Sequence, residues 1–293
     1  MQYQLNKRLV AHFVALITIT IWSLTFVQTK VLLEYLTPIE ILIDRFLLAW
    51  ILFFLFIPKI TFYPLKDEIL FIILGFSGIF AYYILENLAL KYSNAINVGL
   101  IVTTAPIFTT LILIFLQKYE REKVFFTLFG FILVVIGLII MNYNDFSSLN
   151  MGDFLAMLGA LSFGIYSLLL AKVSKGYNIF LVTRKSFFWG LLFLILYFYF
   201  FKESFSSIEI YKLPIVWSNL LFLALIASSL CFLMWRFAVL NIGSSKTSNY
   251  IYLVPIINSI AAIYILGEQL SFNSIIAISF VLIGLFFAQK YGV

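Results

Sequence analysis

The sequence predicts an all-α membrane protein whose ten transmembrane helices form two inverted five-helix repeats around a central cavity. Two apolar segments occur twice, 102–116 again at 251–265 and 133–141 again at 280–288. The copies are 149 and 147 residues apart (255 − 106 and 284 − 137), close to half of the 293 residues. Hydrophobic residues make up 63% and charged residues 11%, whereas about 25% of a soluble domain is charged. A duplicated unit of spans is typical of transporters.

Ten spans of about 20 residues each would use nearly the whole chain. Apolar runs between polar breaks predict helices near 9–33, 38–57, 68–90, 94–117, 123–141, 152–172, 178–201, 215–240, 245–266 and 272–289. The longest connection, at 142–150, separates a first repeat (1–145) from a second (146–293). The first apolar run has a basic flank and lacks a small-residue cleavage site, so we expect a retained span and not a signal peptide.

Lysine and arginine predict the orientation, because they collect in cytoplasmic loops. With both termini in the cytoplasm, that side receives Lys7, Arg8, Lys59, Lys66, Lys118, Arg121, Lys123, Lys172, Lys175, Lys246 and Lys290. The external side receives only Lys91, Lys202 and Lys212. Since each repeat has five spans, the second repeat enters the membrane inverted, and inverted repeats are common in transporters that expose one site alternately to either side.

Several segments resemble a known family. They are "IWSLTF" in the first span, Arg45 within "IEILIDRFLLAW", the proline-centred fourth and ninth spans, "LGEQLSF" and the glycines of the last span of each repeat. In order and spacing they are similar to the drug/metabolite transporter superfamily, EamA type, over essentially the whole chain. Asp44 beside Arg45 departs from the pattern, and "QKYERE" replaces the "GEQLS" motif in the first repeat. The resemblance implies ten helices around a central cavity, cytoplasmic termini, and proton-coupled or facilitated movement of amino acids, metabolites or drugs.

Ionisable side chains inside a membrane are functional candidates by default. Glu86 lies in the third span and could carry a proton or bind a substrate ammonium group. The structural alternative is an ion pair with Lys30, Arg45 or Lys91. Asp44 and Arg45 point about 100° apart on one helix, and we favour packing and salt-bridge roles for both.

The eighth span carries Trp235 and Arg236, which correspond in the repeat to Glu86 and Asn87. Arg236 is a candidate gate on the cytoplasmic side, with snorkelling to the interface as the alternative. The inner basic residues Lys172, Lys175, Arg184, Lys185, Arg236 and Lys246 have no acid assigned near them. They could draw phosphate-bearing or nucleotide-sugar substrates, but membrane topology explains them equally.

A central substrate site is expected between spans one, three, four, six, eight and nine. An aromatic-walled cavity with a few polar groups suits a small molecule, and rings can hold an aromatic amino acid or an organic cation. The residues predicted to bind substrate are Trp22, Tyr82, Glu86, Thr103, Ser162, Tyr166, Trp235, Asn249 and Tyr252. Each could equally contact a neighbouring helix. Pro106 and Pro255 remove backbone hydrogen bonds in mid-span and are candidate hinges.

The sequence therefore predicts a secondary transporter of the inner or plasma membrane and not an enzyme. The substrate class we favour is an amino acid or a related zwitterionic or cationic metabolite that is exported. No Walker motif is present, His12 is the only histidine and Cys231 the only cysteine, so we expect no cofactor or metal, with proton coupling open. A membrane-embedded transferase, the alternative of a different class, would need a polar catalytic cluster near one interface. The expected partners are a small-molecule substrate and the lipid bilayer. We expect no nucleic acid partner, and a homodimer is possible.

Overall fold

Apolar runs of membrane-spanning length form the helices of the computed structural model, which describes residues 2–56, 58, 61, 63–116, 119–141, 151–173, 177–242, 247 and 249–290. Within these ranges the chain is helical and has no strand. Seven helices are long and apolar enough to cross a membrane, and two shorter apolar helices, Tyr250–Leu266 and Phe272–Ala288, follow. The tenth span is the helix Pro38–Phe56, which carries the charged residues Glu40, Asp44 and Arg45. The predicted ten-helix fold is thus confirmed.

In the first half the spans are α1 (Gln2–Leu32), α2 (Pro38–Phe56), α3–η1–α4 (Leu65–Leu74, Gly75–Ala81, Tyr82–Tyr92), α5–α6 (Ala95–Val102, Ala105–Leu116) and α7 (Arg121–Met141). In the second half they are α8 (Met151–Val173), α9 (Ile179–Phe200), α10–η4–α11 (Pro214–Leu221, Phe222–Leu230, Cys231–Ile242), η5–α13–η6 (Asn249–Leu253, Val254–Ala261, Ala262–Leu266) and α14 (Phe272–Lys290). A 3-10 turn, η3 (Ile210–Lys212), lies in the connection between α9 and α10.

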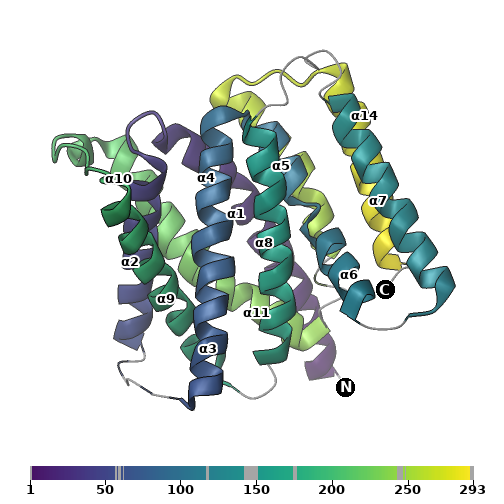
Figure 1. Cartoon of the computed structure of the whole chain (residues 1–293), viewed down its shortest axis with the longest axis horizontal. Helices are drawn as coiled ribbons and strands as arrows, with labels where there is room; N and C mark the ends of the chain where they lie inside the picture. The colour runs from purple at the N-terminus through teal and green to yellow at the C-terminus, as the bar shows by residue number, and fades with distance from the viewer. Residues whose placement is uncertain are drawn as a thin grey trace.

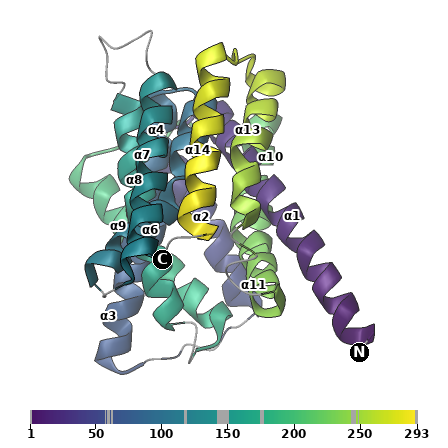
Figure 2. The same ribbon diagram turned by 90° about the vertical axis from the view of Figure 1, so that its right-hand side faces the viewer.

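Both ends of the chain lie at one end of the bundle, called here the N-terminal face (Figure 1). The other end is called the opposite face. Lys59, Lys118, Lys175 and Lys246, on which the predicted orientation partly depends, lie outside the described residues. α1 crosses the bundle obliquely (Figure 2) and packs against α11 and α13.

The packing of one half repeats in the other. α4 packs on α8 as α11 packs on α1, η1 packs on α9 as η4 packs on α2, and α6 packs on α8 as α13 packs on α1. α7 and α14, the last spans of the two halves, lie side by side at one edge (Figure 1). The π-helical segments η1 and η4 also correspond, since they begin 147 residues apart (222 − 75).

The two prolines lie at helix starts and not in mid-helix, which corrects the prediction. Pro106 is the second residue of α6, directly after a break at Thr103 and Thr104. Pro255 is the second residue of α13, directly after the 3-10 turn η5. At the first turn of a helix the missing N–H would be unpaired in any case, so proline is tolerated there without a kink. The span is interrupted before the proline, and the hinge role remains a prediction.

The corner between α4 and α5 joins the two halves at the opposite face. Lys30 donates to the carbonyl oxygens of Leu90 and Ser93, the latter at 2.6 Å, and the Ser93 hydroxyl donates to Asp153 at 2.6 Å. Glu268, from "LGEQLSF", accepts the first N–H groups of α5 at 2.7 and 3.0 Å. The positive ammonium thus meets a helix C-terminus and the carboxylate meets a helix N-terminus, as the helix dipoles favour.

Glu268→Ala is expected to destabilise the protein by about 1 kcal/mol, because loss of an N-capping acceptor typically costs about 0.5–2 kcal/mol. Thermal unfolding in detergent, followed by tryptophan fluorescence, measures the shift. Its neighbour Gln269 is exposed, so Gln269→Ala is the matched control and should leave the midpoint unchanged. Equal midpoints for the two variants would contradict the capping role.

Candidate functional site

A buried charged group lies inside the bundle where α2, α4 and η4 meet. Arg45 and Glu86 are each only 1% exposed. The Arg45 Nε donates to the hydroxyl of the fully buried Ser228 at 2.7 Å. Tyr82 and Arg45 are the polar neighbours of the Glu86 carboxylate. Isolated charges are costly to bury in an apolar medium, so their presence here calls for a functional explanation.

Each side of this group adjoins a π-helical segment. Glu86 lies in the second turn of α4, directly after η1, and Ser228 lies within η4. The wider turn loosens the regular backbone pattern, and such segments are frequent at functional sites. In η1 the carbonyl of Ser77 accepts the hydroxyl of Ser162 at 2.9 Å. In η4 the hydroxyl of Ser229 donates to the carbonyl of Ala224, five residues earlier, at 2.9 Å.

Glu86 forms no ion pair with Lys30, Arg45 or Lys91 in the part of the chain that is described, where the salt bridges are Glu120–Lys123, Glu68–Lys185 and Glu209–Lys212. Arg45 nevertheless acts on Glu86 electrostatically, so both the functional role and the structural pairing of Glu86 stay predictions. Its Oε1 and the Arg45 Nη1 are buried atoms without a hydrogen-bond partner among the described residues. A buried polar atom left without a partner costs about 1–3 kcal/mol, and more when charged.

The other two acids of α2 hold the connection between α9 and α10. Glu40 accepts the Thr37 N–H at 2.8 Å and the Ser206 hydroxyl at 3.0 Å. Asp44 accepts the Tyr211 hydroxyl at 2.9 Å. Arg45, although adjacent to Asp44, points instead to Ser228, as expected for successive helical residues. On α2, Glu40 and Asp44 therefore bond to the connection between α9 and α10, whereas Arg45 bonds to Ser228 in the buried group.

Nine rings form a continuous row through the bundle, called here the aromatic series. Neighbouring centroids are 4.6–5.7 Å apart, within the range of favourable ring pairs. In order they are Trp235, Trp22, Phe232, Phe187, Phe46, Tyr83, Tyr82, Phe163 and Tyr166. Four residues predicted for the site belong to it. The Arg45 guanidinium lies 4.6 Å from the Tyr83 ring centroid.

The structure places Trp22 and Trp235 together at one end of this row and Tyr82 and Tyr166 toward the other end, with Glu86 beside Tyr82. The Trp22 indole donates to the carbonyl of Ala227, next to Ser228, at 3.0 Å. Tyr166 rests on Gly78, where an added Cβ would lie 2.2 Å from its ring. Close approach at this glycine thus admits the tyrosine between η1 and α8.

The remaining predicted contacts bond to the protein itself. Thr103 donates to the carbonyl of Leu100 at 2.6 Å, and Tyr252 donates to the carbonyl of Leu285 at 2.9 Å. These bonds are what the helix-contact alternative expects for a polar group at membrane depth. Asn249 begins η5, but its side chain lies outside what the structure describes.

The basic residues near the N-terminal face are partly neutralised. Lys185 pairs with Glu68, so the expectation that no acid lies near this cluster is wrong. The two residues are 117 apart in sequence, and only the packing of α3 on α9 brings them together. Arg236, the predicted gate, is half-buried in α11.

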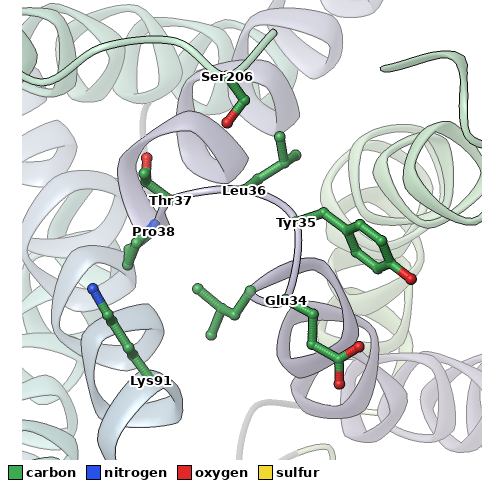
Figure 3. A pocket seen from close by; sticks show the side chains of 8 residues that line it. Glu34, Tyr35, Leu36, Thr37, Pro38, Lys91 and Ser206 are labelled. Carbon is green, nitrogen blue, oxygen red and sulfur yellow. The ribbon is translucent and has the colours of Figure 1, made fainter. Parts of the chain in front are cut away.

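Two hollows lie away from the buried group. One, of about 250 Å³, opens at the opposite face and is lined by the α1–α2 connection, Lys91 and Ser206 (Figure 3). The other, of about 60 Å³, lies among apolar side chains of α6, α7 and α8 beside Thr104. Neither is lined by a residue predicted for the site. In the described residues no group of three potential metal ligands comes together.

Sequence reasoning assigned Arg45 to packing and overlooked Tyr83, Phe46 and Phe187. One signal was available, since Arg45 was already recognised as a possible neighbour of Glu86. The phenylalanines carried none, because the chain has 34 of them.

The profile of the EamA-like transporter family matches residues 9–143 and again residues 150–289. An uncharacterized transporter of Archaeoglobus fulgidus is 27% identical over 277 residues, covering 89% of this chain and 91% of the relative. The uncharacterized transporter YyaM of Bacillus subtilis is 26% identical over 230 residues, covering 76% of this chain and 74% of the relative. One crystal structure superposes with a TM-score of 0.67 at 15% identity, covering 96% of this chain and 97% of that one. At this identity the likeness concerns the fold alone.

Proposed function

Because the chain belongs to the EamA-like transporter family, we propose that it is a secondary active transporter that exports an amino acid or a related zwitterionic or cationic metabolite. It is a multi-pass membrane protein and a transporter of this family. Alternating access follows from the repeat. In inverted-repeat transporters one repeat moves against the other around a fixed binding site. The site between the two halves then opens first to one face of the membrane and then to the other.

Glu86 supports the ammonium-bearing substrate class. It is a carboxylate buried at the contact between the halves, its Oε1 has no hydrogen-bond partner among the described residues, and aromatic rings flank it. An ammonium group would satisfy that oxygen, and the rings would favour a cation or an apolar side chain. The partial neutralisation of the basic cluster by Glu68 counts against a phosphate-bearing substrate at the N-terminal face.

The coupling and the orientation are part of the proposal. After the ammonium group leaves, a proton can take its place on Glu86, so that the carboxyl returns through the membrane uncharged. We place the N-terminal face in the cytoplasm of a cell membrane because the lysine and arginine bias favours it.

Three related compounds test the proposal: L-phenylalanine, phenethylamine without the carboxylate, and 3-phenylpropionate without the ammonium group. Purified protein is reconstituted into liposomes loaded with each radiolabelled compound, and efflux is compared with that of protein-free liposomes. We expect efflux of the two ammonium compounds, faster with an inward proton gradient, and none of 3-phenylpropionate. Transport of 3-phenylpropionate alone would overturn the substrate class.

A further inference from the structure

Arg45 is held in a fixed position by two different contacts. Its Nε donates to Ser228, and its guanidinium lies over the rings of Tyr83 and Phe46, 4.6 and 5.3 Å from their centroids. The side chain is only 1% exposed and is among the largest that the described core buries. A charged group so constrained has lost both its hydration and its rotamer freedom, and it is therefore pre-organised for a partner.

The guanidinium is incompletely satisfied in this position. It carries five N–H donors, of which Nε is used by Ser228 and Nη1 has no acceptor among the described residues. Glu86 and Arg45 interact electrostatically, but they make no ion pair within 4 Å in the described part of the chain. Beyond the Ser228 bond and the interaction with Tyr83, the guanidinium therefore keeps donor capacity for an anionic partner.

The unsatisfied atoms are complementary. Arg45 offers a buried donor and Glu86 a buried acceptor, and the two residues come from α2 and α4, which pack together. A molecule with a carboxylate and an ammonium group on neighbouring atoms would satisfy both. The planar guanidinium fork matches a carboxylate in shape and charge.

We propose that Arg45 binds the carboxylate of the substrate, with Ser228 as its positioning residue, so that α-amino acids are bound in preference to amines that lack a carboxylate. This rests on the proposed function in assigning the ammonium group to Glu86. The aromatic series adjoining Arg45 then receives the side chain, which favours an apolar or aromatic amino acid.

The same three compounds measure the role of each functional group. Equilibrium dialysis in detergent gives the dissociation constants of wild type, Arg45→Gln, Ser228→Ala and Glu86→Gln. Wild type should bind L-phenylalanine about tenfold or more tighter than phenethylamine, because its carboxylate accepts charge-assisted hydrogen bonds from Arg45. In Arg45→Gln this preference should disappear through weaker binding of phenylalanine, with phenethylamine unchanged. Ser228→Ala should reduce the preference in part.

The other possible results distinguish the carboxylate-binding role of Arg45 from the proposed function as an exporter of ammonium-bearing metabolites. Equal weakening of both ammonium compounds in Arg45→Gln and Ser228→Ala would make Arg45 a structural residue and overturn the inference, while leaving an ammonium-binding transporter intact. Binding of 3-phenylpropionate to wild type that is lost in Arg45→Gln would retain the carboxylate role and overturn the proposed function. If no compound binds wild type, both fall. Should Arg45→Gln not fold, Ser228→Ala and Arg45→Lys, which keeps the charge but not the fork, decide the inference by the same preference.

Discussion

Glu86→Gln is expected to weaken binding of L-phenylalanine and of phenethylamine by about 100-fold and to abolish their transport. Removing one charge of a buried, hydrogen-bonded pair typically costs about 3–5 kcal/mol, and each 1.4 kcal/mol is a factor of ten. The glutamine keeps the shape of the side chain, which is 1% exposed, so the charge is the main change. Equilibrium dialysis and liposome efflux measure the two effects.

Glu34→Gln is the matched control for this prediction. Glu34 is an exposed carboxylate on the lining of the hollow at the opposite face (Figure 3), and its loss should change neither binding nor efflux. Unchanged binding in Glu86→Gln, together with an unchanged unfolding midpoint, would exclude Glu86 as the ammonium anchor. A similar loss in both variants would point to general electrostatic attraction at the surface, which added salt would weaken.

Gly130→Ala is expected to destabilise the protein by up to about 3 kcal/mol, at the upper end for an overpacked core. Gly130 of α7 faces Gly284 of α14, and an added Cβ at Gly130 would lie 2.4 Å from the Gly284 carbonyl oxygen. Backbone cannot move aside as a flexible side chain can, so the two helices would have to separate. Small residues allow such close helix contact in membranes.

The control for Gly130→Ala is the same substitution at a roomier glycine. At Gly159 of α8 the nearest atom to an added Cβ would be 3.6 Å away, an ordinary contact. Gly159→Ala should therefore leave the thermal midpoint unchanged or raise it slightly, since alanine favours a helix. Equal midpoints for both variants would show that the α7–α14 contact can relax.

The hydrophobic pattern was sufficient for the helices because the bilayer makes strong demands on a span. A spanning segment must bond its whole backbone internally and must be about 20 residues long, so each apolar run predicted one helix. The interruptions inside spans were harder to predict. Pro106 and Pro255 marked the correct places but indicated kinks, whereas the structure ends one helical piece and starts another before each proline. The π-helical segments η1 and η4 have no sequence signal of comparable strength.

Side-chain partners were the least predictable part of the site. A helix repeats every 3.6 residues, so an error of one residue in a boundary rotates a side chain by about 100°. Glu86 was recognisable as a carboxyl in an apolar run, but whether Arg45 meets Glu86, Glu40 or Ser228 depends on which faces of α2, α4 and η4 pack together. Tyr252 and Thr103 were predicted to contact substrate, yet each bonds to a helix carbonyl.

The sequence by itself determined the ten apolar helices and their duplication, because hydrophobic length and internal similarity are properties of the chain alone. It also identified Glu86 and four of the nine rings in the aromatic series. Only the tertiary structure decided the contacts of Arg45 with Ser228 and Tyr83, the pairing of Lys185 with Glu68, and the capping of α5 by Glu268. These contacts join residues more than 30 positions apart, and they exist only where helix packing has set the distance and direction between two faces.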